Sequence, residues 1–143
     1  NNKYKKLRMF KLSGNNNVSG FVNICGSKTG FPGGINFTDW GAIHDPLVYK
    51  SNYLKESKKN LICFSNLNSN VEIKGSKRNI FIGHPNLKRK NLYDLYIPVK
   101  TPGFDTEGLV VRSDGISLLK LEKKLVSSYI EIKEIINEVK STK

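Results

Sequence analysis

Between residues 4 and 112 the chain consists of short apolar runs, and clusters of Gly, Asn, Ser and Pro interrupt it every few residues. Glycine supplies turn conformations and proline removes a backbone donor, so each cluster ends a regular element soon after it has begun. The runs are rich in β-branched and aromatic residues, and a strand needs only about five residues. We therefore expect short strands at 4–12, 19–25, 35–38, 60–64, 70–74, 79–82, 92–99 and 108–112.

Alternating polarity indicates how these strands pair. Val71 and Ile73 share one face of their predicted strand, and Ile80 and Ile82 share one face of the next. This period of two is typical of antiparallel strands with one buried face. The segment between the two strands, 75–78, looks like a hairpin turn. Glycine and proline make regular structure in 26–34 unfavourable, and the proline before 47–56 suits a short helix there.

Beyond residue 116 the apolar residues recur at spacings of three and four instead of two. Such spacing places them on one face of a helix. The residues that carry the pattern are Leu118, Leu121, Leu125, Ile132, Ile135 and Val139. Ser113 or Asp114 can cap the first turn of this helix. Further apolar residues widen its stripe, which favours docking on a sheet, with oligomerisation through 116–143 as the alternative.

These elements together predict an α+β fold. Residues 1–115 are expected to form a basic, mainly antiparallel β domain, sandwich or barrel-like, and residues 116–143 one long C-terminal amphipathic helix. No stretch approaches the roughly 18 consecutive apolar residues of a membrane-spanning helix, so we expect no transmembrane segment.

The charge of the chain is strongly positive and unevenly placed. Lys and Arg number 24 against 12 Asp and Glu, which gives a formal net charge of +12. Two basic runs contain no acidic residue and together account for much of the excess. The first comprises Lys3, Lys5, Lys6, Arg8 and Lys11. The second comprises Lys74, Lys77, Arg78, Lys88, Arg89 and Lys90.

Two basic patches favour a polyanion as partner, because each neutralised phosphate releases counterions. Aromatic residues lie beside both runs, among them Phe81, Tyr93 and Tyr96, and exposed aromatics can stack on bases. We therefore expect a non-catalytic domain that binds nucleic acid, or assembles with it in a ribonucleoprotein, with weak sequence preference. A composition biased towards Lys and Asn is the alternative source of the charge. A structural or viral assembly protein that oligomerises through its C-terminal helix is the rival function.

Two motifs raise the possibility of an enzyme acting on nucleic acid. Glu72-Ile73-Lys74, with Asp45 upstream, resembles the Asp…Glu-x-Lys signature of restriction-endonuclease-like nucleases. The resemblance implies that the two carboxylates hold a divalent cation and that Lys74 helps to orient the attacking water.

The second motif lies near the predicted last strand. The segments 106–112 and 119–122 are similar to two late motifs of the RNA ligase branch of covalent nucleotidyltransferases. The resemblance implies that Glu107 contacts the nucleotide or its metal and that Lys120 contacts its phosphate. The nucleophile of that family is a lysine in Lys-x-Asp-Gly. Its nearest counterpart is Lys11 in Lys11-Leu12-Ser13-Gly14, which departs at the third position.

The cysteines and histidines carry no recognisable metal motif. Cys25 and Cys63 are too few for a disulfide scaffold, and neither they nor His44 and His84 have metal-ligand spacing. We therefore expect free thiols in a reducing intracellular compartment, or in an assembly such as a virion, and neither a metal nor another cofactor.

Overall fold

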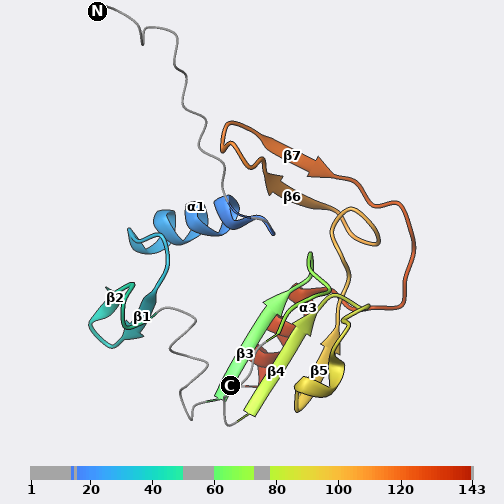
Figure 1. The fold of residues 1–143 in the computed structure, drawn as a ribbon, viewed down its shortest axis with the longest axis horizontal. Coiled ribbons are helices and arrows are strands. Elements are labelled where there is room, and N and C mark those ends of the chain that lie inside the picture. Colours follow the sequence, from blue (N-terminus) through green and yellow to red (C-terminus); the bar gives the residue numbers. More distant parts are fainter. Residues whose placement is uncertain (1–13, 15, 50–59, 73–77, 143) are drawn as a thin grey trace, which may run out of the picture.

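The computed structural model describes residues 14, 16–49, 60–72 and 78–142. Within them the chain forms an α+β fold with two α-helices and seven strands, which confirms the predicted class (Figure 1). The elements follow in the order α1 (Val18–Thr29), β1 (Ile35–Thr38), β2 (Gly41–His44), β3 (Asn60–Ser65), β4 (Arg78–Gly83), the 3-10 turn η1 (Lys90–Leu92), β5 (Leu95–Pro98), β6 (Gly108–Val111), β7 (Leu118–Leu121) and α3 (Ile132–Ser141).

The largest sheet is parallel and has the order β3-β4-β5. In its register Ile62 lies opposite Ile80, and Ile80 lies opposite Leu95. The antiparallel arrangement predicted for this region is therefore wrong, and β4 has no hairpin partner upstream. The alternating polarity that led to the prediction extends over only three residues of β4. That is too short to distinguish a strand with one buried face from a strand that is apolar on both faces. Most of the predicted turn, 73–77, lies outside the described residues.

The other two sheets are antiparallel hairpins, β1–β2 and β6–β7. None of the three sheets closes on itself within the described part of the chain, so neither a sandwich nor a barrel is seen there. The start of α1 is tied to β6, because the side-chain oxygen of Asn17 accepts a hydrogen bond of 2.9 Å from the backbone N–H of Val111.

Three predicted elements have a different structure. Residues 70–72, the described part of the strand expected at 70–74, form no strand. The segment 19–25 was expected as a strand but lies within α1, because a short apolar run fits a helix as well as a strand. The C-terminal helix covers only Ile132–Ser141, whereas Leu118–Leu121 forms β7. The helix begins at residue 132 because Glu131 and Glu134 form a capping box there, so neither Ser113 nor Asp114 is its cap.

The main core cluster lies on one face of the parallel sheet, and Ile82 is buried on the other. Phe81 of β4 is fully buried against Leu87 and Tyr93, and its ring centroid lies 4.9 Å from that of Tyr93. Val71 packs on the same cluster from the connection between β3 and β4. The helices in the described residues are all too short and too polar to cross a membrane.

Candidate functional site

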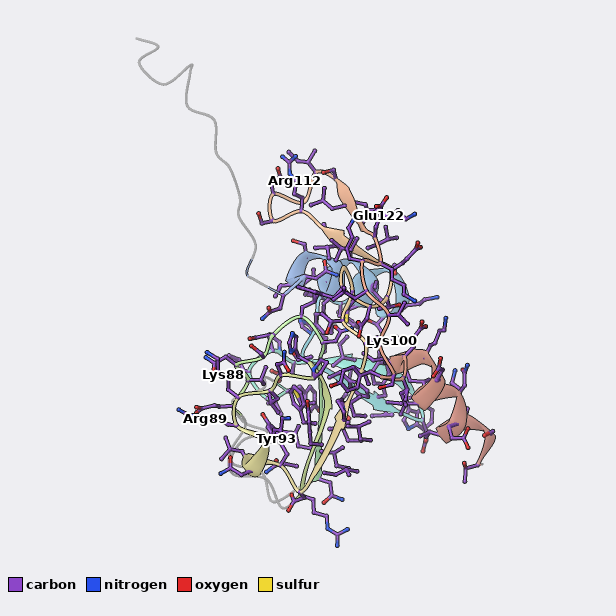
Figure 2. The ribbon with its side chains drawn as sticks, turned by 90° about the vertical axis from the view of Figure 1, so that its right-hand side faces the viewer. Lys88, Arg89, Tyr93, Lys100, Arg112 and Glu122 are labelled. Carbon is purple, nitrogen blue, oxygen red and sulfur yellow. The ribbon has the colours of Figure 1, made fainter. Side chains whose placement is uncertain are left out.

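The basic residues predicted to bind a polyanion are only partly described. Lys3, Lys5, Lys6, Arg8, Lys11, Lys74 and Lys77 lie outside the described residues. The others are exposed, Arg78 at the start of β4 and Lys88, Arg89 and Lys90 in the connection that follows β4. Arg89 forms an ion pair with Glu72. Figure 2 shows Lys88 and Arg89 on one side of the molecule, well away from Arg112 on the β6–β7 hairpin.

The aromatic residues beside this basic connection are not available to stack on bases. Phe81 and Tyr93 are buried in the core. The hydroxyl of Tyr93 donates a hydrogen bond of 2.9 Å to the carbonyl of Val71, and that of Tyr96 donates to the carbonyl of His84 at 2.8 Å. These rings hold the connections onto the sheet, so any binding of a polyanion here would be electrostatic.

The nuclease-like residues have structural partners. The carboxylate of Asp45 accepts backbone hydrogen bonds from Leu47 and Val48, at 2.8 and 3.0 Å, and so stabilises a turn. Glu72 pairs with Arg89, and Lys74 lies outside the described residues. In the described parts of the chain, no three His, Cys, Asp or Glu side chains are grouped so that they could hold a metal ion.

The ligase-like residues Glu107 and Lys120 do lie close together. The Nζ atom of Lys120 is 3.9 Å from Oε1 of Glu107, across the β6–β7 hairpin. Both side chains are about two-thirds exposed, and such pairs contribute about 0–1 kcal/mol. This geometry is that of a surface ion pair. Lys11, the candidate nucleophile, lies outside the described residues.

A small polar pocket lies beyond the carboxyl end of the parallel sheet, where ligands of open α/β sheets commonly bind. Its volume is about 170 Å³, and it is lined by residues that follow β3 and β5 together with the start of α3. Oε1 of Glu131 lies 3.6 Å from Nζ of Lys100, and Oε2 lies 2.7 Å from Nζ of Lys133. The hydrogen bond from Lys133 is the main reason why the pKa of Glu131 falls below its ordinary value.

The turn beside this pocket is held by a buried carboxylate. Asp105 accepts hydrogen bonds from the backbone N–H of Thr101 at 2.5 Å and from the hydroxyl of Ser127 at 2.6 Å. The charges that line the pocket therefore neutralise one another. The turn beside it connects β5 to the segment before α3. This arrangement joins parts of the fold.

One face of the parallel sheet is covered, and the other is covered only in part. Residues opposite each other in a parallel register share a face, so Ile62, Ile80 and Leu95 lie together, as do Phe64, Ile82 and Ile97. Ile82, at the centre of this face, is buried at 6% exposure, and Ile80 and Ile97 are partly buried. We call the three exposed residues of this face, Ile62, Phe64 and Leu95, the open face. The side chains of Ile62, Phe64 and Leu95 are about half exposed.

The connections between the strands explain why this face is open. Val71 from the first connection and Leu87 and Tyr93 from the second all pack on Phe81, on the opposite face. Right-handed crossovers between strands in sequential order fall on the same side, so neither connection covers Ile62, Phe64 or Leu95 on the second face, although Ile82 of that face is buried. In Figure 1 the helix α3 lies behind the sheet, but its own Ile136 and Val139 remain exposed.

The hairpin β1–β2 carries further exposed apolar side chains. Trp40 at its tip is 98% exposed, and Phe37 is also well exposed. A two-stranded hairpin is at most marginally stable in water unless it packs on something else. Our sequence analysis missed both surfaces. For the open face the sequence did contain a signal, the uninterrupted apolar run at 61–64. Such a run is typical of a strand with both faces buried.

Comparisons with known proteins found a similar fold but no matching family. No known family matches the chain, and no curated protein matches it. Among solved structures, a chain of the formyltransferase/hydrolase complex from Methylorubrum extorquens, in complex with methylofuran, is similar with a TM-score of 0.73 at 13% sequence identity. The match covers 92% of this chain but only 38% of that one. The likeness shows a shared fold, which in that protein is part of a longer polypeptide.

Proposed function

We propose that the chain is a structural component of a protein assembly, in which another polypeptide covers the open face. The observation that carries this proposal is the half-exposed row of large apolar side chains on a parallel sheet. Parallel sheets occur almost only where both faces are covered, because their strands are apolar on both sides. A nucleic acid would not cover such a surface, whereas an apolar protein surface would.

The energy available at this face is appreciable. Complete burial of a large apolar side chain contributes about 1.5–3 kcal/mol, so burying the remaining half contributes about 1 kcal/mol for each. Ile62, Phe64 and Leu95 together then contribute about 3 kcal/mol to association. The related fold supports the proposal, since it belongs to a longer chain within a complex.

A matched pair of variants tests the proposal. Ile62→Asp places a charge on the open face, and Ile116→Asp places the same charge on a more exposed isoleucine in the turn between β6 and β7. We expect the chain and Ile116→Asp, each produced in the native host, to elute in size-exclusion chromatography as part of a complex larger than the monomer. Ile62→Asp should elute as the monomer with unchanged circular dichroism. A monomeric wild-type chain, or an Ile62→Asp chain that stays in the complex, would contradict the proposal.

A second candidate function is electrostatic binding of a nucleic acid or another polyanion. Three consecutive exposed basic residues, Lys88, Arg89 and Lys90, favour it. Replacing all three by Gln should reduce the slope of log affinity against log salt concentration by about 2–3. The same change at Lys120, Lys123 and Lys124, which are also exposed, serves as the control. Equal slopes for both triple variants, or no binding at low salt, would exclude this function.

A further inference from the structure

Asn17 lies immediately before α1, at the position where a side chain ordinarily caps the helix. Its carbonyl accepts the first helical hydrogen bond, from the N–H of Phe21 at 3.0 Å. Asparagine is among the preferred residues at this position, because its side-chain oxygen can accept a hydrogen bond from the second or third helical N–H. Among the described residues of the first turn, 18–20, none donates such a bond to Asn17. The side chain therefore makes its contacts elsewhere in the fold.

The side-chain amide of Asn17 lies at the outer edge of β6. Its Oδ1 atom accepts the hydrogen bond of 2.9 Å from the N–H of Val111, and its Nδ2 atom donates a longer one, of 3.5 Å, to the carbonyl of Leu109. One residue of an adjacent parallel strand would pair with the same two groups. A single side chain thus takes the place of a strand residue and joins the start of α1 to the β6–β7 hairpin (Figure 1).

Two local features accompany this contact, and neither is favourable for the helix by itself. Asn16 and Asn17 both have a φ of 60°, in the left-handed region that residues other than glycine seldom adopt. Gly20 lies in the first turn, where glycine lowers helix propensity, but a Cβ there would lie 2.5 Å from Oδ1 and 2.6 Å from Nδ2 of Asn17. Strained backbone persists where other contacts hold it, so we attribute both features to the contact with β6.

We infer that Asn17 is a latch with two positions, a conformational device that either holds α1 on the β6–β7 hairpin or releases it. In the position described above, its amide closes the edge of β6. In the other position its side chain caps α1, and the hairpin is released. Hydrogen bonds near the surface make a modest net contribution in either position, so the two positions differ little in stability. The latch involves none of the residues of the open face.

The latch also sets the separation of the two walls of a cleft. This cleft has a volume of about 390 Å³ and lies between α1 and the turn that joins β6 to β7. Val18, the residue after Asn17, lines one wall, and Ser113, two residues after Val111, lines the other. Release of the latch would therefore widen the cleft and expose the N–H of Val111 to solvent.

Amide hydrogen exchange in variants of the full chain distinguishes a latch with two positions from a fixed contact. Asn17→Asp keeps a good helix cap but removes the group that donates to β6, so it favours the capping position. We expect the amide of Val111 to exchange about tenfold faster than in the wild-type chain, and that of Gly20 to exchange more slowly. Asn17→Ala can adopt neither position, so it should accelerate Val111 without slowing Gly20. The amide of Arg112, which donates to Ser117 within the hairpin at 2.9 Å, is the internal control for folding.

Gly20→Ala tests the latch with Asn17 left in place. The added methyl group displaces the amide of Asn17 from β6, so the amide of Val111 should again exchange about tenfold faster. Gly26→Ala makes the same change in the same helix, where a Cβ meets nothing within 4 Å, and should leave Val111 unchanged. Equal rates for Val111 in the wild-type, Asn17→Asp and Gly20→Ala chains would overturn the latch. Faster exchange at Val111 in Asn17→Asp without slower exchange at Gly20 would contradict the second position.

The wild-type chain provides a measurement that needs no variant. Release of one side chain exposes little surface, so the exchange rate of Val111 should depend only weakly on low concentrations of urea. The amide of Phe81, in the central strand β4, should show the steep dependence of global unfolding. An equally steep dependence for Val111 would show that its hydrogen bond to Asn17 breaks only on global unfolding, and would overturn the inference.

Discussion

Two phenylalanines on opposite faces of the sheet should respond very differently to truncation. Phe81 of β4 is 0% exposed and packs on Tyr93 and Leu87. Phe64, on the neighbouring strand β3, lies on the open face and is about half exposed. The two changes Phe81→Ala and Phe64→Ala remove the same atoms, one ring from a buried position on the central strand and the other from a half-exposed position on an edge strand.

The magnitudes follow from the burial of each ring. Truncation of a fully buried Phe removes its transfer free energy and leaves a cavity, at a cost of about 3–5 kcal/mol. Truncation at Phe64 removes about half of a transfer free energy of about 1.5–3 kcal/mol, and water fills the space. In the free chain we therefore expect Phe64→Ala to lower the free energy of unfolding by about 1 kcal/mol.

Urea unfolding of the free chain, followed by circular dichroism, measures both changes. In the assembly the remaining half of Phe64 becomes buried, so Phe64→Ala should also weaken association by about 1 kcal/mol, or roughly fivefold. A difference of less than about 1 kcal/mol between the unfolding free energies of the two variants would refute the reasoning. Phe64 would then have to be covered in the free chain.

Three further predictions concern single residues. A Cβ on Gly83 would meet the backbone of Ser65 and would lie 2.8 Å from Cε1 of Phe81, whereas one on Gly26 meets nothing within 4 Å. Urea unfolding should show that Gly83→Ala costs about 1–3 kcal/mol and that Gly26→Ala, inside α1, is neutral or slightly stabilising. The pKa of Glu131 is lowered in the folded chain, so its contribution to stability is present above the unfolded pKa and is lost as the pH falls through the folded pKa. Glu131→Gln should therefore flatten the dependence of stability on pH in that acid range, and an unchanged dependence would count against the ion pairs. Burial raises the pKa of Cys63, so its reaction with iodoacetamide at neutral pH should be slower in the folded chain than in urea, and equal rates would contradict its placement against the core.

The parts of the fold that could be predicted from sequence are those with a local signal. The runs that become β1, β3 and β4 lie between turn residues, and their predicted bounds agree with the structure to within a residue at either end. The apolar spacing beyond Ile132 belongs to a real helix, α3. By contrast, Leu118 and Leu121 fit both a helical spacing and a strand, and pairing with β6 determines the outcome.

The direction of strand pairing and the candidate interface could not be predicted in the same way. Whether β4 pairs in parallel depends on where the connections between strands run, which alternation over three residues does not record. Clusters of basic residues were visible in the sequence, but the burial of Phe81 and Tyr93 was not. The open face arises because both connections cover the other side of the sheet, and this is a property of the topology.

Hydroxyl-radical footprinting of the native assembly tests the central claim most directly, because it reports the solvent exposure of individual side chains. The oxidation rate of Phe64 should fall strongly between the free chain and the assembly, since another polypeptide covers the open face. Phe104, which is similarly exposed but lies outside that face, is the matched reference. A Phe64 ring that is oxidised equally fast in both states, relative to Phe104, would contradict the account.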